Sequence, residues 1–171
     1  MSLPEFFFYY HSVVITVLAA LVVTRSNPVH SVVLLLVMFF HVAGLYLFLN
    51  AEFLAAIQII VYAGAILVLF LFVVFLLNLR NELMAKIYII RWPFGLIAVA
   101  GILVIIFSGI RSFTLGPLGE YTIQRIVSET HTVAIGKVLY TQFIFPFEVA
   151  SLLLLVAIVG AVVLAKKQLR T

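Results

Sequence analysis

The sequence contains no cysteine, and this absence removes several classes of site. Without thiolates the chain cannot form disulfides, hold a thiolate-bound iron–sulfur cluster or ligate zinc through cysteine. Its four histidines (His11, His30, His41 and His131) are scattered along the chain and show no metal-ligand spacing. The sequence therefore shows no evident metal centre.

Charge is also scarce, since only 9% of the 171 residues are charged and 66% are hydrophobic. Soluble domains usually contain about 25% charged residues, so this composition indicates an integral membrane protein. All six acids are Glu, and ten Lys or Arg give a net charge of +4. The basic residues lie between apolar segments, so orientation in the lipid bilayer explains them better than nucleic acid does. The first ten residues contain no Lys or Arg, unlike a signal peptide, so we expect a genuine first helix there.

The apolar segments predict an all-α integral membrane protein with five transmembrane helices in a single membrane domain, 1–171. The predicted spans are 5–24, 28–49, 53–78, 92–110 and 147–165. Prolines near the starts of four spans fit helix N-termini, where a missing N–H costs little. These prolines are Pro4, Pro28, Pro93 and Pro146.

The basic residues predict which side each loop faces. Seven of them fall in one set of loops and three in the other. The positive-inside rule places the richer set in the cytoplasm, so we expect the N-terminus outside and the C-terminus inside. The richer set is Arg25, Arg80, Lys86, Arg91, Lys166, Lys167 and Arg170, and the poorer set is Arg111, Arg125 and Lys137.

One extended outer loop, 111–146, separates the last two spans. Its residues 121–127 have a strand-like composition, and Ser128 is placed to cap a short helix over 129–142. Thirty-six residues are too few for a domain of ordinary size, so we expect this loop to lie on the membrane surface or against partners.

The third span is the most informative segment, because polar and flexible residues interrupt an uncharged run over 53–77. Gln58 and Tyr62 are four residues apart, which places them on one face of an α-helix. They either hold the helix bundle together through interhelical hydrogen bonds or serve a polar function. Ala63, Gly64 and Ala65 form a patch with little side-chain volume, which fits close helix packing or a π-bulge.

Ionisable groups deep in the spans are almost absent. Glu52 and Glu148 lie at predicted span ends and are expected to be structural acids at helix N-termini. His41 is the only titratable group near the middle of a span other than tyrosine, and we expect it to be neutral and bonded to a neighbouring helix or a water. Proton carriers normally need such groups, so the sequence predicts no catalysis or charge transfer by this chain alone.

Three segments resemble one known family. The stretch 51–78, with Val61 to Ala65 reading VYAGA, resembles the third helix of the J subunit of proton-translocating NADH:quinone oxidoreductase, respiratory complex I, equivalent to mitochondrial chain 6. Asn27-Pro28 and the stretch 139–167, including Pro146-Phe147-Glu148, agree with the family's second and last helices. The resemblance covers nearly the whole chain and is weakest in the outer loop.

The resemblance implies a non-catalytic subunit in the membrane arm of a redox-driven proton pump. It implies as partners the H, K, A and antiporter-like N subunits, in a bacterial inner membrane or its equivalent. It implies no cofactor on this chain, while the complex uses FMN, iron–sulfur clusters, NADH and quinone. It also implies a π-bulge near residues 62–67 that gates a water path, with Tyr62 and Gly64 at its centre and Gln58, Ala63 and Ala65 beside them.

Three alternatives remain at this point. The chain could instead belong to a related cation/proton antiporter or membrane-bound hydrogenase complex. It could be a stand-alone exporter, although such proteins generally need a membrane-embedded acid that is missing here. It could also be a passive structural scaffold between active subunits.

Overall fold

The computed structural model describes residues 3–77, 92–114, 116, 119 and 122–166, and every regular element in them is helical. The chain divides into two compact units, Met1–Leu118 and Gly119–Thr171. The loop around Lys86, which is predicted to be cytoplasmic, lies outside the described residues, as does most of the positive charge that predicts the orientation. The side of the membrane that each terminus faces stays a prediction.

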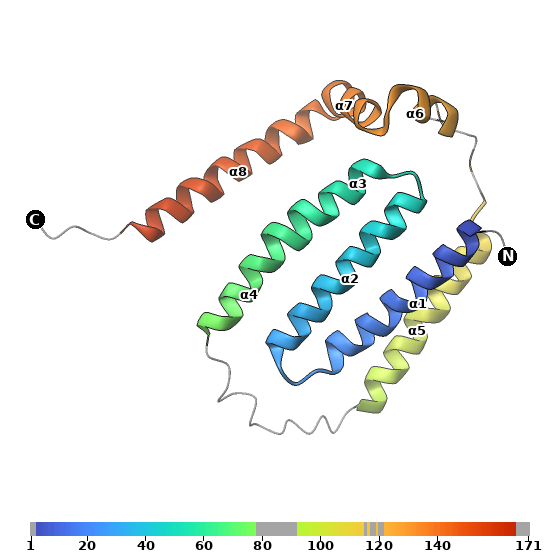
Figure 1. The fold of residues 1–171 in the computed structure, drawn as a ribbon, viewed down its shortest axis with the longest axis vertical. Coiled ribbons are helices and arrows are strands. Elements are labelled where there is room, and N and C mark those ends of the chain that lie inside the picture. Colours follow the sequence, from blue (N-terminus) through green and yellow to red (C-terminus); the bar gives the residue numbers. More distant parts are fainter. Residues whose placement is uncertain (1–2, 78–91, 115, 117–118, 120–121, 167–171) are drawn as a thin grey trace, which may run out of the picture. The chain divides into compact units, whose positions relative to one another are not determined.

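Three spanning helices of the first unit pack side by side (Figure 1). The helix α1 covers Leu3–Thr24, α2 covers Pro28–Phe48, and the third span runs from α3 (Glu52–Ile57) through a π-helix, η1 (Gln58–Ile66), into α4 (Leu67–Leu76). Contacts join α2 to α1 on one side and to the whole third span on the other. The central helix α2 is therefore the support against which η1 is held.

The start of α2 shows why the chain reverses after α1. Asn27 has an extended backbone, and its side-chain oxygen accepts a hydrogen bond from the N–H of Val29 at 3.0 Å. Pro28 occupies the first helical position, where it needs no hydrogen-bond partner. This Asn-Pro pair fixes the start of the second span, as the sequence predicts.

The fourth span is α5, Trp92–Ser112, and it packs against no other helix in the described part of the chain. In the second unit α6 (Ile123–Glu129) and α7 (His131–Thr141) form a short helical hairpin, which leads into α8 (Ile144–Ala165). Within the described residues five helices are long and apolar enough to cross a membrane, in agreement with the five predicted spans.

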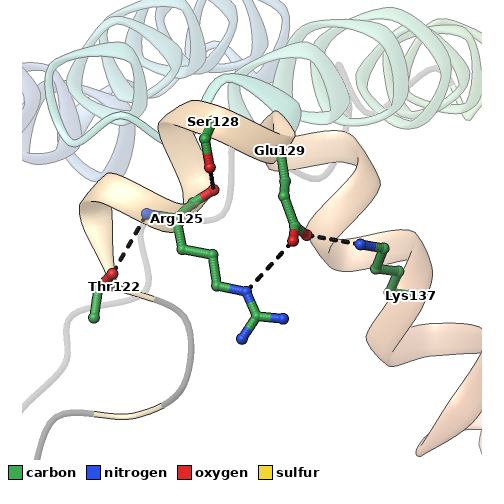
Figure 2. A network of polar contacts seen from close by, with 5 residues as sticks. All are labelled: Thr122, Arg125, Ser128, Glu129 and Lys137. Atoms are coloured by element: carbon green, nitrogen blue, oxygen red, sulfur yellow. Dashed lines mark hydrogen bonds and ion pairs between the residues drawn. The ribbon is translucent and has the colours of Figure 1, made fainter.

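The structure corrects the prediction for the outer loop. Residues 123–129 are helical and not strand-like, because Thr122 caps α6 by accepting a hydrogen bond from the N–H of Arg125. An ion pair between Arg125 and Glu129, four residues apart, further supports this helix (Figure 2). The predicted helix over 129–142 corresponds to α7, but Thr130 and not Ser128 precedes it.

Candidate functional site

The backbone of the third span changes its hydrogen-bond register at mid-membrane depth. Over Gln58–Ile66 the helix is π-helical, and at its end the N–H of Leu67 donates to the carbonyl of Tyr62, five residues earlier. This π-helix overlaps residues 62–67, where a π-bulge was expected, and it begins four residues earlier. Segments of π-helix are rare and frequently occur at functional sites, so this register singles out η1.

The spacing of the buried residues in the third span reflects the extra residue that a π-helical turn contains. Its buried positions are Ala55, Gln58, Ala63, Leu67 and Val74. The step from Gln58 to Ala63 is five residues, which in a regular α-helix would turn the side chain away by roughly 140°. The π-helix therefore buries Ala63 in line with Gln58 against α2, and leaves Tyr62, whose ring touches Phe39, at the edge of that contact.

The π-helical register separates Gln58 from Tyr62, although the sequence predicts that the two side chains share one helix face. Gln58 is buried, whereas Tyr62 is 46% exposed. The Tyr62 ring meets Phe39 of α2 edge-on, with 6.0 Å between the ring centroids. An i, i+4 pair shares a face only in an α-helix, so the inserted residue separates the two polar side chains.

Gln58 is the one buried polar side chain in the described residues, with an exposed fraction of 7%. No hydrogen bond to its amide is found among the described residues. The amide keeps some accessible surface, so a water molecule or a polar group of another subunit can reach it. The side chain therefore marks a polar point inside an apolar helix layer.

The small residues that follow Gln58 permit the π-helical turn. A Cβ built on Gly64 would lie 3.3 Å from the carbonyl oxygen of Ile59, on the preceding turn. Ala63 is packed against α2, whereas Gly64 and Ala65 are exposed. Within this patch, Ala63 lets α2 pack closely against η1, and Gly64 avoids a close contact between a Cβ atom and the Ile59 carbonyl.

Glu52 and Glu148, the two acids expected at helix N-termini, differ in their distance from the starts of their helices. Glu52 is the first residue of α3 and exposed, as a helix N-terminal acid should be. Glu148 is the fifth residue of α8, because that helix begins at Ile144 and not near 147. It therefore lies beyond the first turn, where the helix dipole acts most strongly.

A histidine pair between α1 and α2 was not predicted. His11 and His41 have ring centroids 5.7 Å apart, and the Nδ1 atom of each lies within hydrogen-bond distance of the carbonyl four residues earlier in its own helix. The Nδ1 atom of His41 is thus bonded within α2, and no bond from His41 to a neighbouring helix is found in the part of the chain that the structure describes. A Cβ on Gly44 would lie 2.5 Å from Nε2 of His11, so only glycine at position 44 admits this imidazole. Sequence offers no signal that pairs residues so far apart.

Comparison with known protein families matches residues 18–164 to NADH-ubiquinone/plastoquinone oxidoreductase chain 6. The chain belongs to this family. A NAD(P)H-quinone oxidoreductase subunit 6 from the organellar chromatophore of Paulinella chromatophora is 42% identical over 148 residues, covering 84% of this chain and 68% of that protein. The NADH-quinone oxidoreductase subunit J of Rickettsia conorii is 38% identical over 152 residues, covering 84% and 71%.

A third relative, the NADH-ubiquinone oxidoreductase chain 6 of Cyanidium caldarium, is 41% identical over 150 residues and is covered to 74% of its length. Membership of the chain 6 family and five apolar spanning helices together identify an integral protein of an energy-conserving membrane. The family match also includes all of η1, which lies well inside the matched residues.

Proposed function

We propose that this chain is a non-catalytic membrane subunit of NADH-quinone oxidoreductase in which η1 gates a water path for protons. The observation that carries the proposal is the π-helical register over Gln58–Ile66, which begins at a buried polar side chain. Family membership supports the complex, and the local geometry supports the gate.

The gate consists of an exchange between Ala63 and Tyr62 on the face that meets α2. In the π-helix Ala63 follows Gln58 on this face. If the turn becomes a regular α-helix, the segment beyond it rotates by roughly 100° and the residue four positions on, Tyr62, takes that place. The exchange replaces a methyl group with a phenol, so both the volume and the polarity beside Gln58 change.

The regular register is the conducting one in this proposal. Side chains four residues apart on a helix have Cβ atoms roughly 5–6 Å apart, so one water can join the Gln58 amide to the Tyr62 hydroxyl. In the π-helical register the Tyr62 ring lies against Phe39, and no hydrogen bond joins it to the Gln58 amide in the described residues. A redox event in a neighbouring subunit needs only to favour one register over the other to open or close the path.

The mobile protons belong to other subunits in this scheme. Apart from Tyr62, η1 contains no ionisable side chain, and a gate requires none. We propose the H, K, A and antiporter-like N subunits as neighbours, with FMN, iron–sulfur clusters and quinone held elsewhere in the complex. Affinity purification through a tag on this chain should recover NADH-oxidising subunits, and recovery of hydrogenase subunits in their place would contradict the respiratory assignment.

A passive scaffold is the second candidate, and the apolar surface of two helices favours it. Among the described residues α5 and α8 bury no side chain within the chain, so lipids or partner subunits must cover them. A scaffold would need these surfaces but would not need a change of register in η1.

Substitution of Gly64 by valine separates the two candidates. Valine adds a Cβ only 3.3 Å from the Ile59 carbonyl and two methyl groups beyond it, so η1 loses its freedom to change register. We expect Gly64→Val to give an assembled complex with impaired proton pumping and quinone reduction.

The matched control is Gly101→Val in α5, where an added Cβ meets nothing within 4 Å. It should leave both activities unchanged. If Gly64→Val prevents assembly, Gly64→Ala provides the smaller perturbation at the same site. An assembled Gly64→Val complex that pumps normally would refute the gate and leave the scaffold.

A further inference from the structure

The contact between α2 and η1 includes an aromatic pair, Phe39 of α2 and Tyr62 of η1, which we call the ring pair. The ring centroids are 6.0 Å apart and the ring planes stand at 80° to each other. Aromatic rings in this edge-on arrangement attract each other when their centroids are roughly 4.5–7 Å apart. The ring pair therefore attaches one side chain of the π-helix to the helix that supports it.

The Tyr62 side chain has little else to hold it within the described part of the chain. Its hydroxyl makes no hydrogen bond there. The side chain is 46% exposed, so few neighbouring atoms surround the ring. Phe39 is half-buried, so its ring is the better fixed of the two. The contact with Phe39 is therefore the main interaction within the chain that orients Tyr62.

The ring pair depends on the register of η1. A change to a regular α-helix turns the segment that contains Tyr62 by roughly 100° about the helix axis. A side chain on the helix surface lies roughly 5 Å from this axis, so the turn moves it by roughly 8 Å. A displacement of this size exceeds the range over which two rings attract each other. The ring pair in its present geometry thus belongs to the π-helical register and is lost in the regular one.

We propose that Phe39 is a positioning residue that sets the balance between the two registers of η1, because the ring pair stabilises the π-helical one. This inference rests on the proposed gate and identifies a residue outside η1 that holds the gate closed. An interaction shifts an equilibrium only when its free energy differs between the two states, and the ring pair meets this condition. Phe39 touches no reacting group and acts through the position of Tyr62.

The ring pair is not the only interaction that favours the π-helical register. Ala63 is 3% exposed in this register, so the methyl group is closely packed where the regular register would place the larger phenol of Tyr62. Loss of the ring pair should therefore shift the balance without abolishing the π-helix. The strength of an edge-on aromatic pair corresponds to a change of about fivefold in the ratio of the two registers.

The test compares the intact complex with and without the Phe39 ring. Density maps are recorded at rest and during turnover, and particles are sorted by the acceptor of the Leu67 N–H. This acceptor is the carbonyl of Tyr62 in the π-helix and that of Ala63 in a regular helix. Phe39→Leu removes the ring but keeps a large apolar side chain, so α2 should still pack. We expect it to raise the ratio of regular to π-helical particles about fivefold.

Four further variants show whether the ring pair itself is responsible. Phe40 is the next residue on α2 and is 50% exposed, so Phe40→Leu removes a ring away from Tyr62 and should leave the ratio unchanged. Phe39→Tyr keeps a ring at position 39 and should keep the ratio close to the wild-type value. In a Tyr62→Leu background, Phe39→Leu should have no further effect on the ratio. If Phe39→Leu does not assemble, Phe39→Met removes the ring with a more adaptable side chain and should give the same shift.

The outcomes separate the role of Phe39 from the gate itself. A wild-type complex that visits both registers, in a ratio that Phe39→Leu does not change, would overturn the role of Phe39 and leave the gate. An equal shift in the Tyr62→Leu background would also overturn it, because Phe39 would then act without the ring pair. A regular register that appears only in Phe39→Leu would support the ring pair and contradict the gate. A π-helix alone in both complexes would overturn both.

Discussion

Replacement of Gly44 by alanine gives the most direct quantitative test of the helix layer that supports η1. The new Cβ would lie 2.5 Å from Nε2 and 3.0 Å from Cδ2 of His11, well inside van der Waals contact. The imidazole cannot easily turn away, because its Nδ1 bonds to the Phe7 carbonyl at 2.8 Å and its ring lies against Phe48. Overpacking of this kind costs about 1–3 kcal/mol, so α1 and α2 should separate or lose their register.

A double-mutant cycle distinguishes this clash from a general loss of stability. Gly44→Ala and His11→Ala should each lower the unfolding temperature of the purified chain in detergent. The double variant should be more stable than the sum of the two losses predicts, with a coupling of about 1–2 kcal/mol. Gly101→Ala is the control, because its Cβ meets nothing within 4 Å, and it should be neutral or stabilising by up to about 1 kcal/mol. Additive losses in the cycle would refute the close approach of His11 to Gly44.

Three further predictions concern the polar side chains. Tyr62→Phe removes only a hydroxyl, so turnover and pumping should fall modestly while assembly persists, and unchanged rates would make Tyr62 a packing residue. Gln58→Leu puts an apolar side chain in place of a buried polar one, so it should stabilise the chain by about 1 kcal/mol in thermal unfolding and yet impair pumping; destabilisation would contradict this. The hydrogen bond from Lys137, with the charges of Lys137 and Arg125, lowers the pKa of Glu129. The ion pairs should therefore persist as the pH falls below the ordinary carboxyl pKa and break only at the lowered value, and carboxyl NMR should show the midpoint rising in Lys137→Gln.

Hydropathy alone predicted the five spans, because length and charge content decide whether a helix can cross a bilayer. The segment 123–129 was predicted wrongly, since β-branched composition is a weak signal beside a Thr122 cap and a favourable ion pair. Glu148 was expected at a helix start, but α8 begins earlier, at Ile144. Hydropathy was thus a reliable signal for the long spans, whereas the short helix α6 and the start of α8 depend on local hydrogen bonds that composition does not reveal.

The candidate site was only partly predictable for a different reason. The residues themselves stood out, because Gln58 and Gly64 are unusual at mid-membrane depth. Which side chain shares a face with Gln58 could not be predicted, because a period of 3.6 residues assigns Tyr62 to the face that Ala63 occupies in the structure. Likewise, the contact of His11 with Gly44 depends on how two helices cross, which composition does not encode.

The backbone register of residues 58–67 in the assembled complex decides whether η1 changes its hydrogen bonds during turnover. Density maps at rest and during turnover, at a resolution that shows main-chain hydrogen bonds, would reveal the acceptor of the Leu67 N–H. We expect Tyr62 to be the acceptor in one state, as in the present structure, and Ala63 to be the acceptor in the other, with Tyr62 moved to the Gln58 face. The same five-residue bond in every state of the working enzyme would contradict this expectation.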